Sequence, residues 1–165
     1  NKIVGWFQGR GEIGPRALGN RSILMNPAIP DGKDKLNNQV KKREHWRPYA
    51  PSIIEEDCSE WFECEKSEYM LRTIKAKKPD RVPAVVHIDN TSRIQTVTRK
   101  SNEVFYKLLC KFKERTGIPM LLNTSLNTGG KPIFSTKSQC VEMIETTEID
   151  MVCYGDSILT KHKHL

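Results

Sequence analysis

The sequence is organised around one stretch near its start, residues 9–22, which reads GRGEIGPRALGNRS. Glycine allows positive φ and the close approach of other groups. Arginine offers a planar fork of donors that matches a carboxylate or a phosphate. A loop that combines four glycines with three arginines is typical of an anion-binding segment, and a flexible, solvated basic loop is the alternative. The three arginines are Arg10, Arg16 and Arg21.

A G-x-G-x-x-G pattern falls inside this stretch, at residues 9–14, after a strand predicted over Lys2–Phe7. The dinucleotide-binding fold requires a helix that opens at this point and an acidic residue about 20 positions further on. Pro27 and Pro30 interrupt the region instead, and no clear second strand of a βαβ unit follows. The pattern therefore does not indicate a dinucleotide site.

A second basic stretch covers residues 40–51, VKKREHWRPYAP. A helix is predicted from Asp31 or Asp34 to about Glu44, and cations in its last turn suit the helix dipole without any ligand. The dipole does not explain Arg47, which lies between two aromatic residues and before a proline that stiffens the chain. The stretch therefore offers a set of positioned cations, Lys41, Arg43 and Arg47.

A third stretch, residues 123–132 with the sequence NTSLNTGGKP, follows a strand predicted over Ile118–Leu122. Hydroxyl and amide groups at the end of a strand, followed by Gly-Gly, fit a ligand loop at the carboxyl edge of a sheet. An ordinary Asn/Gly turn is the alternative. The candidate ligand groups belong to Asn123, Thr124, Ser125 and Asn127.

The rest of the chain alternates between helical and strand patterns. Further helices are predicted over Glu55–Glu63, from a cap at Ser101 to Gly117, and from a cap at Ser135 to about Thr146. Further strands are predicted over Ser22–Met25, Tyr69–Ile74, Val82–Ile88, Ser92–Val97, Asp150–Tyr154 and Ser157–Thr160. This order predicts an α/β fold with an open, mixed parallel/antiparallel sheet and flanking helices.

Length and composition limit the class of protein. The chain has 165 residues, of which 37% are hydrophobic and 28% charged, which fits one domain over 1–165. No apolar run approaches the roughly 20 residues that span a bilayer, no signal peptide is recognised, and the five cysteines are interpreted as reduced thiols. We therefore expect a soluble, cytoplasmic protein with no membrane partner.

The net charge of the chain and the absence of several known catalytic motifs limit the reactions that it could catalyse. The net charge of +7 favours anionic partners, although a basic surface without any specific partner has the same charge. No metal site is expected, and His162 and His164 lie in a cationic tail that opposes metal binding. The sequence has no Ser-His-Asp set, no HExxH motif, no Walker A motif and no obvious general base. Cations and amides without a base suit phosphate chemistry, in which positioning and charge neutralisation dominate.

On four motifs the sequence resembles the C-terminal domain of the NodU/CmcH-type O-carbamoyltransferases. The motifs are residues 9–22, 40–51, 92–97 (SRIQTV) and 123–127 (NTSLN), and they occur in the family's order over essentially the whole chain. The resemblance implies a YrdC-like fold, which is a twisted mixed sheet with a concave, basic ligand surface. It also implies that this domain joins carbamoyl phosphate and ATP, with Mg²⁺, into carbamoyl adenylate.

The resemblance further implies a partner domain. An upstream ASKHA-like domain of the same chain, which holds an iron and a second nucleotide site, would move the carbamoyl group to a hydroxyl of the acceptor. The chain does not begin with Met. We therefore expect it to be a fragment of a longer carbamoyltransferase, whose full activity needs that upstream domain.

The same resemblance assigns roles to individual residues. The Lys-x-Arg motif of YrdC-like domains falls on Lys41 and Arg43, and the Ser-x-Asn motif falls on Ser125 and Asn127. We expect the phosphates of carbamoyl phosphate and ATP to be held by Lys41, Arg43, Arg47 and Arg93. The adenylate would be bound by Ser125 and Asn127, with Asn123 and Thr124 beside them. The loop arginines Arg10, Arg16 and Arg21 would serve either this site or the junction with the upstream domain.

Two other interpretations remain open at this point. A basic concavity beside aromatic residues also suits a nucleotide- or RNA-binding module without its own catalysis, although nucleic acid is not the expected partner. A purely structural domain that braces the upstream one predicts no ligand binding at all.

Overall fold

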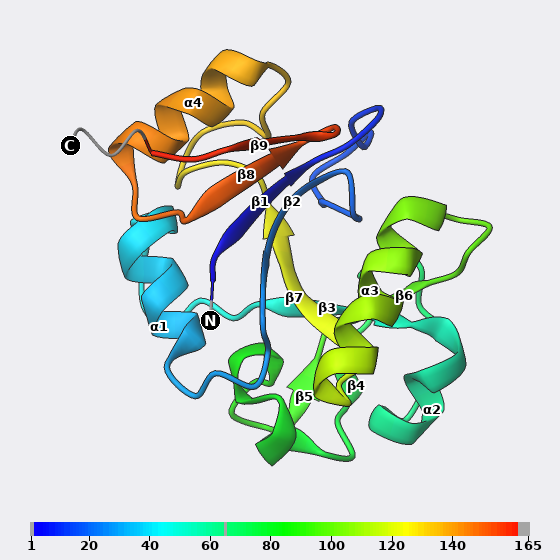
Figure 1. The fold of residues 1–165 in the computed structure, drawn as a ribbon. Helices are drawn as coiled ribbons and strands as arrows, with labels where there is room; N and C mark the ends of the chain where they lie inside the picture. Colours follow the sequence, from blue (N-terminus) through cyan, green and yellow to red (C-terminus); the bar gives the residue numbers. More distant parts are fainter. Residues whose placement is uncertain (1, 65, 162–165) are drawn as a thin grey trace.

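The computed structural model describes residues 2–64 and 66–161, and the tail histidines lie outside them. Its centre is a seven-stranded sheet in the order β6-β3-β7-β2-β1-β8-β9 (Figure 1). The strands are β1 (Val4–Phe7), β2 (Arg21–Met25), β3 (Ala50–Ile54), β6 (Gln95–Val97), β7 (Met120–Ser125), β8 (Met151–Tyr154) and β9 (Ser157–Leu159). Only the β3–β6 and β1–β8 pairs are parallel, so the predicted mixed sheet is confirmed.

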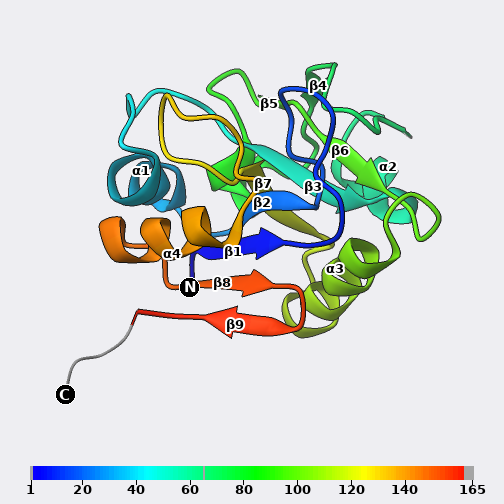
Figure 2. The same ribbon diagram turned by 90° about the horizontal axis from the view of Figure 1, so that it is seen from above.

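Within the described residues, four α-helices and a small second sheet surround the main sheet (Figures 1 and 2). The helices are α1 (Gly32–Leu36), which continues as a π-helix over Asn37–Lys41, α2 (Cys58–Trp61), α3 (Glu103–Thr116) and α4 (Lys137–Thr146). The small sheet pairs β4 (Ile74–Lys75) with β5 (Thr91–Ser92), and 3₁₀ turns cover Glu55–Asp57, Pro79–Arg81 and Pro83–Val85. No helix of the described residues is long and apolar enough to cross a membrane.

The main sheet separates two hydrophobic cores, because successive side chains of a strand point to opposite faces. On one face, Leu24 and Leu121 pack with Phe105 and Leu109 of α3. On the other face, the neighbouring strand residues Ile23, Met25, Met120 and Leu122 join a larger core that includes residues of α1, α2 and α4. Accordingly, α3 lies well away from α1 and α4 (Figure 2).

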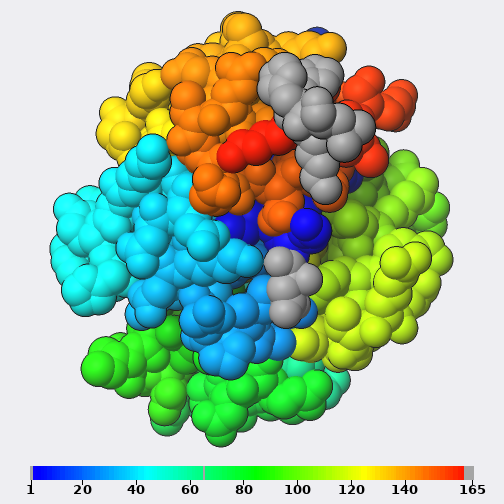
Figure 3. Space-filling model, turned by 60° about the vertical axis from the view of Figure 1, so that its left-hand side comes forward, coloured from blue at the N-terminus to red at the C-terminus, as the bar shows by residue number. Residues whose placement is uncertain are grey.

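In Figure 3, the dark blue start of the chain lies below the orange segment, between blue to cyan segments on one side and yellow-green segments on the other. Lys2 Nζ lies 2.7 Å from Asp150 Oδ1, and the Ile3 amide donates to Asp150 Oδ2 at 2.7 Å. An apolar groove of about 520 Å³ runs beside this point between α3 and the β1–β8 pair, with Trp6, Phe112 and Met151 among its lining residues.

Several predicted elements are confirmed. The strands near Lys2–Phe7, Ser22–Met25, Asp150–Tyr154 and Ser157–Thr160 form within one or two residues of their predicted bounds. Gly117 ends α3 in the left-handed conformation, with φ 71°. All five cysteines are free thiols.

Other predictions are wrong. The strand predicted over Tyr69–Ile74 is reduced to Ile74–Lys75, because Tyr69 and Leu71 point into solvent. The strand predicted over Val82–Ile88 is a 3₁₀ turn at Pro83–Val85 followed by loop; Val82, Ala84 and Val85 are buried without pairing in the sheet, whereas Ile88 is exposed.

Helix boundaries also differ from prediction. The caps are Asn102 and Thr136 rather than Ser101 and Ser135, and each accepts a hydrogen bond from a first-turn amide. The first helix ends at Lys41 rather than near Glu44, because Lys42 adopts a left-handed φ of 49°.

Candidate functional site

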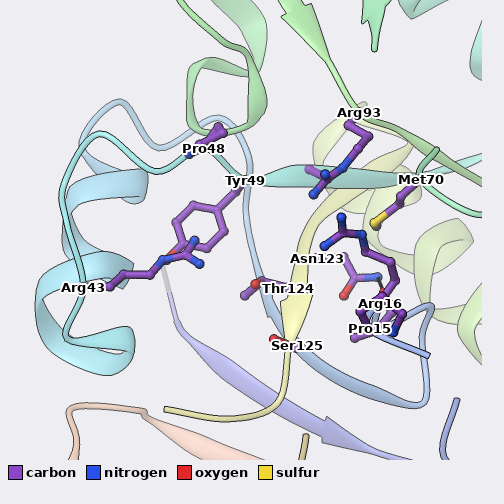
Figure 4. Close-up of a pocket in the computed structure, with 12 residues that line it drawn as sticks. Pro15, Arg16, Arg43, Pro48, Tyr49, Met70, Arg93, Asn123, Thr124 and Ser125 are labelled. Carbon is purple, nitrogen blue, oxygen red and sulfur yellow. Dashed lines mark hydrogen bonds between the residues drawn. The ribbon is translucent and has the colours of Figure 1, made fainter. Parts of the chain in front are cut away.

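The four motifs meet around one pocket of about 110 Å³ (Figure 4). Loop 9–22 contributes one wall, the segment before β3 a second, and the end of β7 the floor. The lining residues are Pro15, Arg16, Ala17, Arg43, Pro48, Tyr49, Ala50, Met70, Arg93, Asn123, Thr124 and Ser125. Residues that are far apart in the sequence therefore form a single site.

Three arginines face this pocket from three different segments. Figure 4 shows the guanidinium groups of Arg16 and Arg93 directed toward each other, with Arg43 across the pocket. Burial, and then the charge of Arg16, lower the pKa of Arg93, and its Nε is buried without a hydrogen-bond partner. Among the described residues, no carboxylate forms a salt bridge with any of the three. Uncompensated, converging guanidinium groups favour a bound anion.

Arg43 is oriented by a residue that the sequence analysis missed. Its Nε donates to Asn37 Oδ1 at 2.8 Å, and its guanidinium group lies over the Tyr49 ring, 4.6 Å from the ring centre. The Tyr49 hydroxyl donates to the same oxygen at 2.5 Å, and burial raises the pKa of Tyr49 to about 12. An asparagine within the predicted helix was the available signal, because asparagine has low helix propensity.

Lys41 does not line the pocket but lies beneath the loop that follows β7. Its Nζ donates to Ser125 O at 2.5 Å, Asn127 Oδ1 at 2.6 Å and Asn127 O at 3.1 Å. A Cβ on Gly129 would lie 2.5 Å from the carbonyl oxygen of Lys41, so the loop passes too close for any side chain there. The Lys-x-Arg and Ser-x-Asn motifs are therefore joined directly, through the ammonium group.

Loop 9–22 is held by its own carboxylate. Glu12 Oε1 accepts hydrogen bonds from the amides of Leu18 at 2.8 Å and Asn20 at 2.7 Å. Arg21 is buried, donates to the carbonyls of Gln8 and Gly9, and lies 3.4 Å from the centre of the Phe7 ring. Arg10 is exposed. Of the three loop arginines, only Arg16 lines the pocket.

A buried polar network supports the floor of the pocket. Ser52 Oγ donates to Gln95 Oε1 at 2.6 Å, and Gln95 Nε2 donates to the carbonyl of Leu18 at 2.9 Å. Asn123 Nδ2 donates to Ser52 Oγ at 2.8 Å and to the carbonyl of Ala17 at 3.1 Å. Three strands are thereby tied to the Gly/Arg loop. The sequence analysis quoted Gln95 as part of the 92–97 motif but gave it no role, and it missed Ser52, which lies in a strand that was not predicted.

The remaining predicted ligands lie at the margin of the pocket or form hydrogen bonds with other residues of the protein. Arg47 is half exposed and its Nε lies 3.3 Å from Glu44 Oε2. Asn127 accepts from Lys41 and from the Ser125 hydroxyl, the latter at 2.7 Å. Thr124 and Ser125 line the pocket.

A second cavity of about 100 Å³ adjoins the pocket and shares Tyr49 and Arg93 with it. It adds Thr73 and His87, neither of which the sequence analysis singled out. Burial lowers the pKa of His87, and its Nδ1 lies 3.3 Å from Thr91 Oγ1. An imidazole whose charged form is disfavoured by burial therefore lies next to the arginine-lined pocket.

The site's donor set suits phosphate oxygens more than a metal ion. No carboxylate lines the pocket, and among the described residues no three His, Cys, Asp or Glu side chains are grouped closely enough to hold a metal. Mg²⁺ prefers carboxylate and phosphate oxygens. In this pocket it would therefore depend on the phosphates of a nucleotide for its ligands.

The chain is similar to known proteins along most of its length. The family described as carbamoyltransferase C-terminus matches residues 1–161. Nodulation protein NolO of Bradyrhizobium diazoefficiens is 42% identical over 165 residues, which cover 96% of this chain and 30% of the relative. The 3'-hydroxymethylcephem-O-carbamoyltransferase of Streptomyces clavuligerus is 41% identical over 157 residues, which cover 94% of this chain and 30% of that enzyme. Nodulation protein U of Sinorhizobium fredii is 43% identical over 86% of this chain. The chain thus spans about a third or less of the length of these relatives.

Proposed function

The chain belongs to the family of carbamoyltransferase C-terminal domains, and from this we propose that its arginine-lined pocket binds the phosphate-bearing donor in a carbamoyl transfer to a hydroxyl group. The observation that carries the proposal is the convergence of Arg16, Arg43 and Arg93 on one pocket without a carboxylate partner among the described residues. The relative that is named as an O-carbamoyltransferase, the Streptomyces clavuligerus enzyme, suggests the hydroxyl acceptor.

The reaction that we assign to this pocket is the formation of carbamoyl adenylate. Carbamoyl phosphate, ATP and one water molecule give carbamoyl adenylate, phosphate and pyrophosphate. Every reactant and product except water is an anion at neutral pH, so fixed guanidinium groups stabilise charge at each stage. The adjoining cavity shares Arg93 and provides room for a second group beside the first.

Roles for the chain's own residues follow from their contacts. Arg16, Arg43 and Arg93 bind phosphate oxygens, with Arg43 held in place by Asn37. Lys41 acts as a positioning residue, because its hydrogen bonds go to Ser125 and Asn127. Arg47 stays a predicted phosphate ligand at the margin of the site.

Substitution of the pocket arginines tests the proposal in the full-length protein. Loss of one charge-assisted hydrogen-bonding group costs about 1.5–3 kcal/mol, which is roughly 10- to 100-fold in affinity. Arg16→Ala and Arg93→Ala should each weaken the binding of carbamoyl phosphate by that factor in calorimetric titration. They should also abolish pyrophosphate exchange into ATP that depends on carbamoyl phosphate.

Arg99→Ala is the matched control, because Arg99 is an exposed arginine of the same chain that pairs with Glu103. It removes the same charge from a residue that does not line the pocket and should leave both measurements unchanged. Equal effects of Arg93→Ala and Arg99→Ala would mean that net charge, and not a site, attracts the anion.

A specific observation favours one further candidate, RNA binding without catalysis. Trp46 is 65% exposed, and the Arg47 guanidinium carbon lies 6.0 Å from its ring centre. An exposed aromatic beside a cation is the usual platform for an unpaired base. Binding of single-stranded RNA that weakens steeply with salt and is lost in Trp46→Ala, with no effect of ATP, would support this candidate over the transferase role.

A further inference from the structure

The carboxamide of Asn123 lies at the floor of the pocket with one of its two polar atoms unused. The residue is 2% exposed, and it lines the pocket. Its Nδ2 is within hydrogen-bond distance of three acceptors, whereas its Oδ1 is buried and accepts no hydrogen bond from the described residues. A buried acceptor that is left unpaired costs free energy, so such atoms in native proteins call for a partner.

The hydrogen-bond network fixes which way this amide points. The Ala17 carbonyl, 3.1 Å from Nδ2, can only accept a hydrogen bond. The Ser52 hydroxyl gives its proton to Gln95 Oε1, so it too can only accept from Asn123. Gln95 is itself fixed by its donation to the Leu18 carbonyl. If the Asn123 amide were rotated by 180°, its oxygen would face the acceptor oxygens of Ala17 and Ser52, which is unfavourable. Nδ2 therefore faces the network, and Oδ1 is left for a ligand in the pocket.

The pocket therefore presents two kinds of group at once. Arg16, Arg43 and Arg93 offer donors and positive charge, while Asn123 Oδ1 offers a fixed acceptor. A simple anion such as phosphate satisfies the first set only. A ligand that satisfies both carries an N–H donor and an anionic group within one small volume.

Resting on the proposed function, we propose that Asn123 determines substrate specificity by accepting a hydrogen bond from the –NH₂ of carbamoyl phosphate, whose phosphate lies against the three arginines. The –NH₂ and phosphorus of carbamoyl phosphate are separated only by one carbon and one oxygen. The amino group of adenine is separated from the phosphates of ATP by the purine and the ribose. A pocket of about 110 Å³ is smaller than the roughly 300 Å³ at which drug-sized ligands begin to fit, so it suits the smaller molecule.

The first test needs no mutation. Phosphonoacetamide and acetonylphosphonate are stable analogues with the same phosphonate and carbonyl, and they differ in –NH₂ against –CH₃. Sites that bind a substrate N–H reject the analogue that lacks it, because the acceptor stays unpaired. In calorimetric titration of the full-length protein, phosphonoacetamide should bind about 10- to 100-fold more tightly than acetonylphosphonate.

Two variants then assign the preference to Asn123. Asn123→Leu keeps the shape without the acceptor, and it should reduce the preference for phosphonoacetamide to within about twofold of parity. Ser52→Ala is the matched control, because it removes a hydrogen bond from the same network but leaves Oδ1 in place. It should change the affinity for both analogues equally and keep their ratio.

The outcomes separate this inference from the proposed function. Equal binding of the two analogues to the wild-type protein overturns the role of Asn123 while leaving the anion site intact, and this holds even if Asn123→Leu does not fold. Retention of the full preference in a folded Asn123→Leu protein overturns it as well. Failure of both analogues to bind the wild-type protein would overturn the anion site itself.

Discussion

The ammonium group of Lys41 lies beneath the pocket, surrounded by oxygens of Ser125 and Asn127. Burial, together with the nearby charge of Arg43, lowers the pKa of Lys41 to about 7. In the unfolded chain that pKa returns to about 10.4. Between these two values the unfolded chain binds more protons than the folded one, so the free energy of unfolding increases with pH.

The lowered pKa of Lys41 in the folded protein predicts a pH dependence of stability that is lost when Lys41 is replaced. From about pH 7 to about pH 9, the free energy of unfolding of the wild-type protein should rise relative to that of Lys41→Met, approaching about 1.4 kcal/mol per pH unit. Urea unfolding at several pH values measures both proteins. Subtraction removes the opposing contribution of Cys140, whose pKa burial raises to about 11 in both. Parallel curves would show that Lys41 keeps its ordinary pKa in the fold.

The sequence predicted only some of the residues that line the pocket. The motifs indicated Arg43, Arg93 and Ser125, and all three line it. They could not distinguish Arg16 from Arg10 and Arg21, because that choice depends on how Glu12 folds the loop. Asn37 and Ser52 were missed and Gln95 was given no role, since their contacts come from chain segments that are distant in sequence.

Among the elements, the Gly/Arg loop owes its shape to Glu12, which accepts from two of its amides. Glu12→Ala leaves those part-buried donors without this acceptor, so we expect a loss of about 1–3 kcal/mol of unfolding free energy. Hydrogen exchange at Leu18 and Asn20 should accelerate, and phosphate affinity should fall because Arg16 is no longer held. Glu145→Ala, which changes an exposed carboxylate on α4, is the control and should alter none of these.

The first turn of α4 gives a prediction that distinguishes the contributions of Thr136 and Ser135 to stability. Thr136 Oγ1 accepts from the Gln139 amide, and Gln139 Oε1 accepts from the Thr136 amide, which forms a capping box. Thr136→Ala should therefore cost about 1 kcal/mol of stability in urea denaturation. Ser135→Ala, at the position that the sequence analysis favoured, should cost far less. A larger loss in Ser135→Ala would restore the original assignment.

Helices and strands were predicted correctly where a segment's own residues determine its structure. They were not predicted where pairing with other segments determines it. The pattern of α3 predicts it from its own residues. β3 was not predicted, because Pro48 and Pro51 argue against a central strand. In the sheet, Pro51 pairs only with Leu122, and the β6 ladder begins one residue later at Ser52, so the missing N–H of Pro51 lies where β6 has no partner for it.

At the scale of the whole molecule, the two cores share the strands that separate them. Leu109 belongs to the core under α3 and Leu36 to the larger core, and both are fully buried. Replacing either with Ala should cost about 2–5 kcal/mol. Because β2, β3 and β7 contribute to both cores, each variant should shift one common transition, seen alike by tryptophan fluorescence and far-ultraviolet circular dichroism. Two separate transitions in Leu109→Ala would mean that the cores unfold independently.

The overall architecture was predictable as a class but not as a strand order. Mixed helix and strand patterns indicated an α/β fold with a mixed sheet, which is confirmed. The order of the strands depends on pairings such as β1 with β8, about 147 residues apart, and no local pattern reports these.

The position of β1 between β2 and β8 has a consequence for synthesis. Of the strands in this sheet, the first to leave the ribosome pairs with one of the last, Val4 with Met151 and Phe7 with Tyr154. Contacts of such sequence separation are typical of slow folding. Until β8 emerges, the growing chain holds β1 with an open edge, and such edges recruit other strands. The nascent chain is therefore the form most exposed to aggregation, and the form that a chaperone would recognise.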